Sequence, residues 1–499
     1  MERNWLQISC QRDVSKTNFE RGVQDFNFSV GGRYGFVPSK SYFRVELKLQ
    51  SKDDGGSLFP PTRKDNLALA DNVVSNLYNN CYFKAGGADV SSIVNYSAHA
   101  HQVKTRLSKS KAWLDSMGKS AYFHDPDFQS RVNTTSSDGE QGGEVKRYQK
   151  LGSDPSLTVT IQNTGLVDTT LTQLTKPEYE IKVGDVLDMG GIPYYVTTAP
   201  SADSGAGVMA VQPIPTVAVV GSSVDTQVIK TYTPKTDRAN SLYVQWQPPI
   251  GIFDTVGVLG SGTYRIQLNP NANYKKACVE ALTDLSLSAQ DNSYDIEVAD
   301  VQLLVCIEKA NIPSTGVEKL YLTEMQVQSK TLASTGTNLL DFTVPPSTKA
   351  ITVFMQSSKA GSDNVIPLTK FRTKDDNDLN MQAIQITYAN VSKPSTNFTS
   401  EYIGQKNFLT QRYLDSQISS GLANSVGGPE SFRDWVKRGP IFHFDFERDA
   451  EDRSTHVQLN LQTLNVEEGT NVFIVSHYSK VCEISTTNGM ISNVVSLAI

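Results

Sequence analysis

The feature that most constrains the fold is a set of short motifs that occurs twice, in the same order, in the two halves of the chain. Three motifs of the first half return in the second, namely Asp71-Asn72-Val73 as Asp363-Asn364-Val365, Trp113-Leu114-Asp115-Ser116 as Tyr413-Leu414-Asp415-Ser416, and Ile266-Gln267-Leu268-Asn269 as Val457-Gln458-Leu459-Asn460. Because a repeated order of motifs is the signature of duplicated structural units, we expect two related domains.

The spacing of these motifs differs between the halves and indicates an insertion. Leu114 and Leu268 are 154 positions apart, whereas Leu414 and Leu459 are 45 apart, a difference of 109. A stretch of that size, residues 131–239, is also the most loop-like part of the first half. Gly and Pro residues separate its short runs of alternating apolar residues, which is typical of short strands joined by turns. We therefore predict an inserted β-rich surface subdomain at 131–239.

Strand patterns dominate the rest of the chain. Residues 42–49 alternate cleanly, with the apolar Phe43, Val45, Leu47 and Leu49 on one face and charged residues on the other, so this strand is predicted to be covered on one side only. About eight such strands are predicted in each half. This number favours an all-β fold of two consecutive jelly-roll β-barrels over immunoglobulin sandwiches. The predicted bounds are 1–310 for the first jelly roll, 311–316 for a linker and 317–499 for the second jelly roll.

One short helix is predicted within each β-unit. In residues 99–117 the apolar side chains recur at helical spacing, and residues 408–418 show a similar pattern. Leu114 and Leu414 occupy the repeated motif in these two segments. We expect both leucines to face the apolar interior of their own unit.

Composition argues against several classes of function. The 499 residues carry a formal charge of −6, and no basic arm stands at either end. The densest basic stretch is interpreted as a solvated helix face in preference to a nucleic-acid patch, so no direct nucleic-acid site is predicted; it consists of Lys104, Arg106, Lys109, Lys111 and Lys119. No segment has the roughly 18–20 continuous apolar residues that span a bilayer, and no secretory signal is recognised.

The cysteines indicate neither a disulfide framework nor a zinc site. They are odd in number, widely spaced and without a CxxC pair, and they are Cys10, Cys81, Cys278, Cys306 and Cys482. Cys306 lies in an apolar run and is interpreted as a small buried hydrophobe. Folding in a reducing compartment, the cytosol or the nucleus, is therefore expected.

Few titratable residues are spaced for chemistry. His99 and His101 would point apart on a helix and could share a metal only on a strand, where no carboxylate or cysteine stands nearby. His443, Asp445 and Glu447 alternate along a strand, so a metal or acid/base site is conceivable. We favour a structural interpretation, in which the phenylalanines between them face the core and these three side chains face solvent or a neighbouring subunit.

Two other patterns are also interpreted as turns. Residues 449–453 are acidic but lack the ligand spacing and the glycine of a calcium-binding loop. Gly257, Gly260 and Gly262 do not have the spacing of a dinucleotide fingerprint, and a strand is expected after them. No catalytic, cofactor-binding or metal residues are predicted, no cofactor is expected, and the chain is not expected to be an enzyme.

The chain resembles the double jelly-roll major capsid proteins of icosahedral DNA viruses, and is most similar to those of Polinton-like viruses and virophages. The resemblance covers about residues 20–490 and rests on the two strand-rich halves and on two segments, Gln247-Pro248-Pro249-Ile250-Gly251-Ile252-Phe253-Asp254 and Tyr264-Arg265-Ile266-Gln267-Leu268-Asn269-Pro270. It implies a virion protein that forms homotrimers, in which six jelly rolls make a pseudo-hexagonal capsomer. Partners would then be further copies of the chain, neighbouring capsomers, and minor and penton capsid proteins.

Two other classes of function compete with this interpretation. A minor or penton capsid protein would also be rich in β-structure, but a penton usually has one jelly roll per chain. A glycan-binding or glycan-cleaving β-sandwich would require clustered exposed tryptophans beside paired carboxylates. The four tryptophans are scattered instead, at Trp5, Trp113, Trp246 and Trp435.

Overall fold

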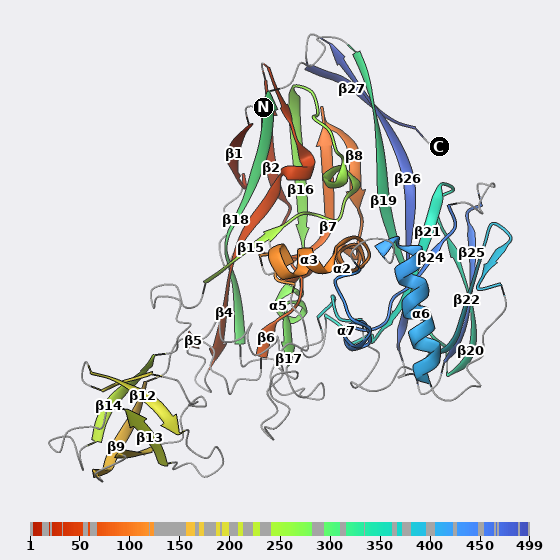
Figure 1. Cartoon of the computed structure of the whole chain (residues 1–499). Coiled ribbons are helices and arrows are strands. Elements are labelled where there is room, and N and C mark those ends of the chain that lie inside the picture. The colour runs from red at the N-terminus through yellow and green to blue at the C-terminus, as the bar shows by residue number, and fades with distance from the viewer. Residues whose placement is uncertain are drawn as a thin grey trace.

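The computed structural model shows two β-units side by side and a smaller barrel (Figure 1). It describes residues 3–11, 19, 22–31, 33–52, 58–59, 67–118, 120–123, the backbone of six strands between 156 and 229, and 241–281, 294–309, 316–333, 335–361, 367–371, 381–395, 405–422, 427–447, 454–463, 466, 469–487 and 490–497.

The first unit consists of two antiparallel sheets that face each other. One has the spatial order β1 (Arg3–Ser9), β18 (Tyr294–Lys309), β4 (Tyr42–Lys52) and β15 (Ser241–Trp246), with β3 (Tyr34–Phe36) on β18 and β5 (Leu58–Phe59) on β4. The other has the order β2 (Gln24–Val30), β16 (Gly262–Pro270), β7 (Tyr78–Ala85) and β8 (Ala88–Ile93). A separate two-stranded sheet pairs β6 (Leu67–Leu69) with β17 (Val279–Ala281).

The second unit repeats this arrangement. One sheet has the order β19 (Gly316–Thr331), β26 (Asn471–Thr487), β21 (Thr348–Gln356) and β24 (Phe442–Asp445), with β27 (Met490–Leu497) on β26. The other has the order β20 (Gly336–Thr343), β25 (His456–Thr463), β22 (Met381–Tyr388) and β23 (Val391–Lys393).

The strand order shows that the units are two copies of one topology. Eight strands of the first unit have a counterpart at the same place in the equivalent sheet and in the same order along the chain, namely β1/β19, β2/β20, β4/β21, β7/β22, β8/β23, β15/β24, β16/β25 and β18/β26. Eight strands in two four-stranded sheets with this crossing order form a jelly roll. The predicted double jelly roll is confirmed.

The alternating pattern of β4 explains why its sheet has one core face. Phe43, Val45 and Leu47 are fully buried, whereas the residues between them are half-buried on the outer face. Burial of each such side chain contributes roughly 1.5–3 kcal/mol to the free energy of folding. Cys306 on β18 is also fully buried, as predicted.

The helices lie in equivalent connections of the two jelly rolls. Between β8 and β15 lie α2 (Ser97–Ser108), α3 (Lys111–Trp113) and a π-helical turn, η3 (Leu114–Gly118). Between β23 and β24 lie α6 (Gln405–Ser419) and α7 (Phe432–Lys437). Shorter helical turns are η1 (Pro38–Lys40), α1 (Val73–Asn76), η6 (Gly251–Asp254) and α5 (Tyr274–Ala277).

The two helical leucines of the repeat differ in burial, which corrects one prediction. Leu114 is buried as predicted, but Leu414 is 52% exposed and its neighbour Ile418 is 60% exposed. The side of α6 that meets the second unit is polar, because Ser416 donates a hydrogen bond to the Ile441 carbonyl and accepts one from the His443 backbone N–H. These bonds cover the open edge of β24, so the leucine is turned outward.

The third repeated motif lies in equivalent strands, β16 and β25. The second copy of the first motif, residues 363–365, lies outside the described residues. So do residues 311–315 of the predicted linker and the acidic turn predicted at 449–453.

The predicted β-rich insertion is confirmed as a closed barrel in the β8–β15 connection. Its spatial order is β10 (Thr169–Gln173), β13 (Val208–Gln212), β12 (Ile192–Thr198), β11 (Val186–Met189), β14 (Ser223–Ile229) and β9 (Ser156–Thr164), with β9 pairing back to β10. Closure leaves no free sheet edge, so a small barrel can be stable without covering strands. The bounds 131–239 stay a prediction, because residues on both sides of the barrel strands lie outside the described part.

Candidate functional site

A network of buried polar contacts lies where the two jelly rolls meet, and we call this region the seam. Its first component is the α2 helix of the first unit. The His99 imidazole packs against the Phe473 ring at a centroid distance of 4.7 Å and lies parallel to the Phe371 ring at 5.9 Å. Its Nε2 atom is 2.7 Å from Gln356 Oε1. Burial lowers the pKa of His99 to about 4, so the imidazole is neutral at physiological pH.

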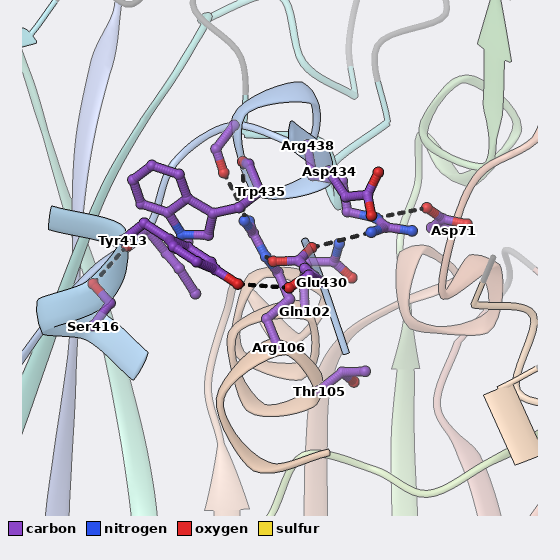
Figure 2. A network of polar contacts seen from close by, with 12 residues as sticks. Asp71, Gln102, Thr105, Arg106, Tyr413, Ser416, Glu430, Asp434, Trp435 and Arg438 are labelled. Atoms are coloured by element: carbon purple, nitrogen blue, oxygen red, sulfur yellow. Dashed lines mark hydrogen bonds and ion pairs between the residues drawn. The ribbon is translucent and has the colours of Figure 1, made fainter. Parts of the chain in front are cut away.

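The second component is a cluster of four buried charges. Glu430 accepts hydrogen bonds from Arg106 Nε at 2.8 Å and from Arg438 Nη1 at 3.2 Å. Arg438 Nε also lies 3.1 Å from Asp71 Oδ2. Figure 2 shows Glu430 between the two guanidinium groups, with Asp71 on the far side of Arg438. Two residues come from each unit, so the ion pairs between them tie the two jelly rolls together.

The two arginines respond differently to burial. Desolvation lowers the pKa of Arg106, and the carboxylates of Glu430 and Asp71 offset only part of that effect. Desolvation acts in the same direction on Arg438, but Asp71 and Glu430 outweigh it and the net shift of its pKa is upward. Arg106 is held further by the backbone carbonyls of Gly439, at 2.8 Å, and Trp435, at 3.4 Å. Both guanidinium groups therefore stay charged and fixed in position.

The third component is a buried carboxyl group, Glu324 on β19. It accepts hydrogen bonds from the Ser91 hydroxyl on β8 and, at 3.2 Å, from the Gly251 N–H at the start of η6. Burial raises the pKa of Glu324 to about 7, although both hydrogen bonds act in the opposite direction. Gly251 has no room for a side chain, because a Cβ there would lie 2.6 Å from the Thr323 carbonyl oxygen.

The C-terminal strand β27 adds a fourth contact. Ile491 packs against the first unit at Gly262, where a Cβ atom would lie 2.8 Å from the isoleucine Cδ1. On β26, Lys480 Nζ donates to the Val90 carbonyl at 2.8 Å. The seam thus extends from the α2 helix to the far ends of β26 and β27.

The histidine pair predicted to point apart does so. α2 is helical, so His99 enters the seam while His101 lies on another side with its ring 6.3 Å from that of Trp246. The described residues hold no group of three or more His, Cys, Asp and Glu side chains arranged to bind a metal ion.

The prediction for the polar strand face was wrong for His443. This side chain is buried, and its Nδ1 atom is 2.9 Å from the Thr352 hydroxyl, which is also 2.9 Å from His477 Nε2. Burial lowers the pKa of His443 to about 4 and that of His477 to about 3. Asp445 is half-buried and Glu447, which follows the strand, is exposed and 3.0 Å from Lys349. Alternation along the sequence could not show that the outer face of this sheet is itself covered.

The basic stretch is not a solvated helix face as a whole. Arg106 is buried in the seam, Lys104 pairs with Asp254 at 2.7 Å, and Lys111 pairs with Asp115 at 3.1 Å. Lys109 lies over the Trp113 ring at 5.7 Å, and Lys119 lies outside the described residues. The four described cations of this stretch are thus engaged within the chain.

The glycines at 257–262 and the helices bear on two further sequence predictions. β16 begins at Gly262, so a strand and not a helix follows Gly257 and Gly260, as predicted. No helix in the described part of the chain is both long and apolar enough to cross a bilayer.

Sequence comparisons give no relative. No family model matches the chain, and no curated protein matches it. Comparison of structures does give similar folds. A chain in the cryo-EM structure of the Sputnik virophage aligns with a TM-score of 0.55 and 12% identity, over 100% of this chain and 88% of that one.

Two further structures align over most of their length with lower scores. The mavirus major capsid protein has a TM-score of 0.44 and 11% identity, over 99% of this chain and 90% of that chain. The Faustovirus major capsid protein has a TM-score of 0.44 and 8% identity, over 96% and 90%. The Sputnik alignment shows that the fold of this chain, a double jelly roll, also occurs in a virophage particle.

Proposed function

We propose that this chain is a major capsid protein, which forms homotrimeric, pseudo-hexagonal capsomers of an icosahedral shell. The observation that carries the proposal is the presence of two complete jelly rolls of identical strand order in one chain. Three such chains provide six equivalent barrels, so a threefold assembly can occupy a position of sixfold shape. The fold shared with a chain of the Sputnik virophage supports the same role.

The seam supports this proposal because it fixes one jelly roll against the other. A tile with sixfold outline requires a constant angle between its two barrels. Buried ion pairs and hydrogen bonds are directional, so they define that angle more narrowly than an apolar contact would. The cluster of Asp71, Arg106, Glu430 and Arg438 provides this rigidity.

We further propose that the chain has no enzymatic activity and uses no cofactor, and that it resides in the virion after folding in the host cytoplasm or nucleus. This proposal is supported by the buried ionisable groups, which bond to other groups of the chain. Glu430 accepts hydrogen bonds from Arg106 and Arg438, and His443 and His477 both contact the hydroxyl of Thr352. The partners would be further copies of the chain together with minor and penton capsid proteins.

The alternatives are less well supported. A penton protein with one jelly roll does not explain the duplicated unit. A glycan-binding sandwich requires a cluster of exposed tryptophans, but Trp246 and Trp435 are buried in the seam region and the core.

Mass photometry of the purified protein tests the proposal. A mass of about three chains at nanomolar to micromolar concentration is expected, and negative-stain images should show particles with a hexagonal outline. A folded protein that stays monomeric at micromolar concentration would contradict the proposal, and a pentamer would favour the penton alternative.

A further inference from the structure

A buried carboxyl group lies where β19 of the second jelly roll meets β8 of the first (Figure 1). Glu324 is 1% exposed and accepts hydrogen bonds from the Ser91 hydroxyl of β8 and from the Gly251 N–H of η6. Ser91 Oγ in turn accepts from the Ile252 N–H at 3.3 Å. Because β8 and η6 belong to the first unit and β19 to the second, both hydrogen bonds of the carboxyl group join the two units.

Within the described part of the chain, Glu324 has no ion pair, because the two lysines that act on it electrostatically are bonded elsewhere. Lys480 Nζ donates to the Val90 carbonyl at 2.8 Å. Lys104 Nζ lies 2.7 Å from Asp254 Oδ2 of η6. A negative charge on Glu324 would therefore be buried without a counter-ion in contact, which costs free energy.

The hydrogen bonds of this site suit a neutral carboxylic acid. A serine hydroxyl can donate one hydrogen bond and accept two. Ser91 Oγ can therefore accept from the Ile252 N–H and from a protonated Glu324 at the same time, while the other carboxyl oxygen accepts from the Gly251 N–H. The neutral acid thus keeps both contacts between the units without burying a charge.

The packing around Glu324 leaves no room for a hydration shell. A Cβ atom at Gly251 would lie 2.6 Å from the Thr323 carbonyl oxygen and 3.1 Å from Glu324 Oε1, so η6 and β19 are in backbone contact. On the neighbouring strand β26, Cys482 is fully buried, with its Sγ 3.5 Å from the Val90 carbonyl of β8. An ionised Glu324 is therefore hydrated only when β8 and η6 move away from β19, and the same movement uncovers Cys482.

The electrostatics of the site give the direction of the pH effect. Burial raises the pKa of Glu324 from its ordinary value of 4.5 to about 7, although its hydrogen bonds, Lys480 and Lys104 act in the opposite direction. Its cross-strand partner Tyr478 is uncharged, because burial raises the pKa of the phenol to about 12. The closed seam thus binds a proton that the open seam releases, so a rising pH favours opening. His99 has the opposite effect, because its lowered pKa favours opening at low pH.

We propose that Glu324 makes the seam pH-sensitive: as a neutral acid it holds β8 and η6 of the first jelly roll on β19 of the second, and its ionisation releases them. The two jelly rolls are therefore held less firmly above neutral pH than in slightly acidic solution. This property goes beyond the proposed function and does not depend on it, because all the groups involved belong to one chain.

The test is the rate at which iodoacetamide labels Cys482 in the full-length protein, followed by mass spectrometry. The comparison is with Glu324→Gln, whose amide can donate to Ser91 and accept from Gly251 as the neutral acid does, but cannot ionise. At any one pH the reactivity of the thiol and the titration of His99 are common to both proteins and cancel in the ratio of their rates. The ratio of the wild-type rate to the variant rate should rise about 30-fold from pH 5.5 to pH 8.5, as expected for a carboxyl group with a pKa of about 7 in the closed seam and 4.5 in the open one.

Two controls separate opening of the seam from other causes of labelling. Glu297→Gln removes a half-buried carboxylate of β18 that pairs with Lys48 at 3.4 Å, away from the seam, and Cys482 in this variant should be labelled as in wild type at both pH values. Cys81 lies in the core of the first jelly roll and reports unfolding of the whole chain. It should react more slowly than Cys482 at pH 8.5.

Two results would overturn the proposal. A ratio of wild-type to Glu324→Gln rates that stays the same from pH 5.5 to pH 8.5 would show that the carboxyl group does not control the seam. Equal labelling of Cys482 and Cys81 in wild type would show that the thiol is reached only when the whole chain unfolds. If the glutamine variant does not fold, Glu324→Met, which also cannot ionise, gives the same comparison. The oligomeric state enters neither result, so the proposed capsomer is tested separately by its mass.

Discussion

Replacing Glu430 with Met removes the carboxylate that two buried arginines share, and Arg106 then keeps its charge with only two backbone carbonyls as partners. Removing one partner of a buried ion pair typically costs about 3–5 kcal/mol, because the other charge is left uncompensated. The Arg106→Met variant should lose a comparable amount, since it leaves Glu430 with Arg438 alone.

The expected change in melting temperature follows from chain length. The roughly 390 residues outside 131–239 have an unfolding entropy of about 0.8 kcal/mol/K at about 2.1 cal/mol/K per residue. A loss of about 4 kcal/mol therefore lowers the melting temperature by about 5 °C. Differential scanning calorimetry at pH 7 measures both this shift and whether the two jelly rolls unfold in one transition.

The double variant Arg106→Met with Glu430→Met is the decisive comparison. It removes one positive and one negative charge together and leaves Arg438 paired with Asp71 at 3.1 Å. It should be more stable than either single variant, with a coupling energy of at least about 1.5 kcal/mol. The control is Lys349→Met, which breaks the exposed pair with Glu447 and should cost less than about 1 kcal/mol. Additive losses in the double variant, or a single loss as small as the control's, would refute the role assigned to the cluster.

Three further predictions concern other parts of the chain. Burial lowers the pKa of His443 to about 4 and that of His477 to about 3, below the ordinary value near 6.5. Below pH 6.5 the unfolded chain therefore binds more protons than the native state, so the free energy of unfolding should fall as the pH drops. The expected loss at pH 5 is about 2 kcal/mol for each histidine. Chemical denaturation at pH 7 and pH 5 measures this loss, which His443→Gln with His477→Gln should reduce, and a pH-independent stability would contradict it. Leu114→Ala should cost about 2–5 kcal/mol, whereas Leu414→Ala should leave the unfolding free energy of the monomer within about 0.5 kcal/mol of wild type; equal effects in denaturation curves would show that α6 is placed wrongly. Replacing residues 131–239 by a short Gly-Ser linker should leave a soluble oligomer by size-exclusion chromatography, because the described barrel pairs only with itself, and aggregation would mean that the segment stabilises the first jelly roll.

The β-rich class and the duplication could be predicted from sequence because they depend on local patterns. Alternation at Phe43, Val45 and Leu47 specifies which face of a strand is buried, whatever lies beyond it. The repeated motif around Leu268 and Leu459 does lie in equivalent strands, and the different spacing of the motifs located the insertion. A period of two residues is a property of the strand itself, so the buried faces of strands can be recognised from the sequence without knowledge of tertiary contacts.

The seam could not be predicted, because its contacts join residues that are far apart in the chain. Arg106 and Glu430 are separated by 324 positions, and Arg438 and Asp71 by 367. In the sequence, Arg106 looks like one more cation of a basic helix, and His443 like an outward residue of a strand. Arg106 is buried because the second unit packs against α2, and His443 is buried because its face of the sheet is covered, although alternation along the strand predicts that this face is exposed. Local periodicity determines the two faces of each element, but which face is shielded from water depends on tertiary packing. The packing of the two jelly rolls decided the seam, and the packing of α6 on the edge of β24 decided the exposure of Leu414.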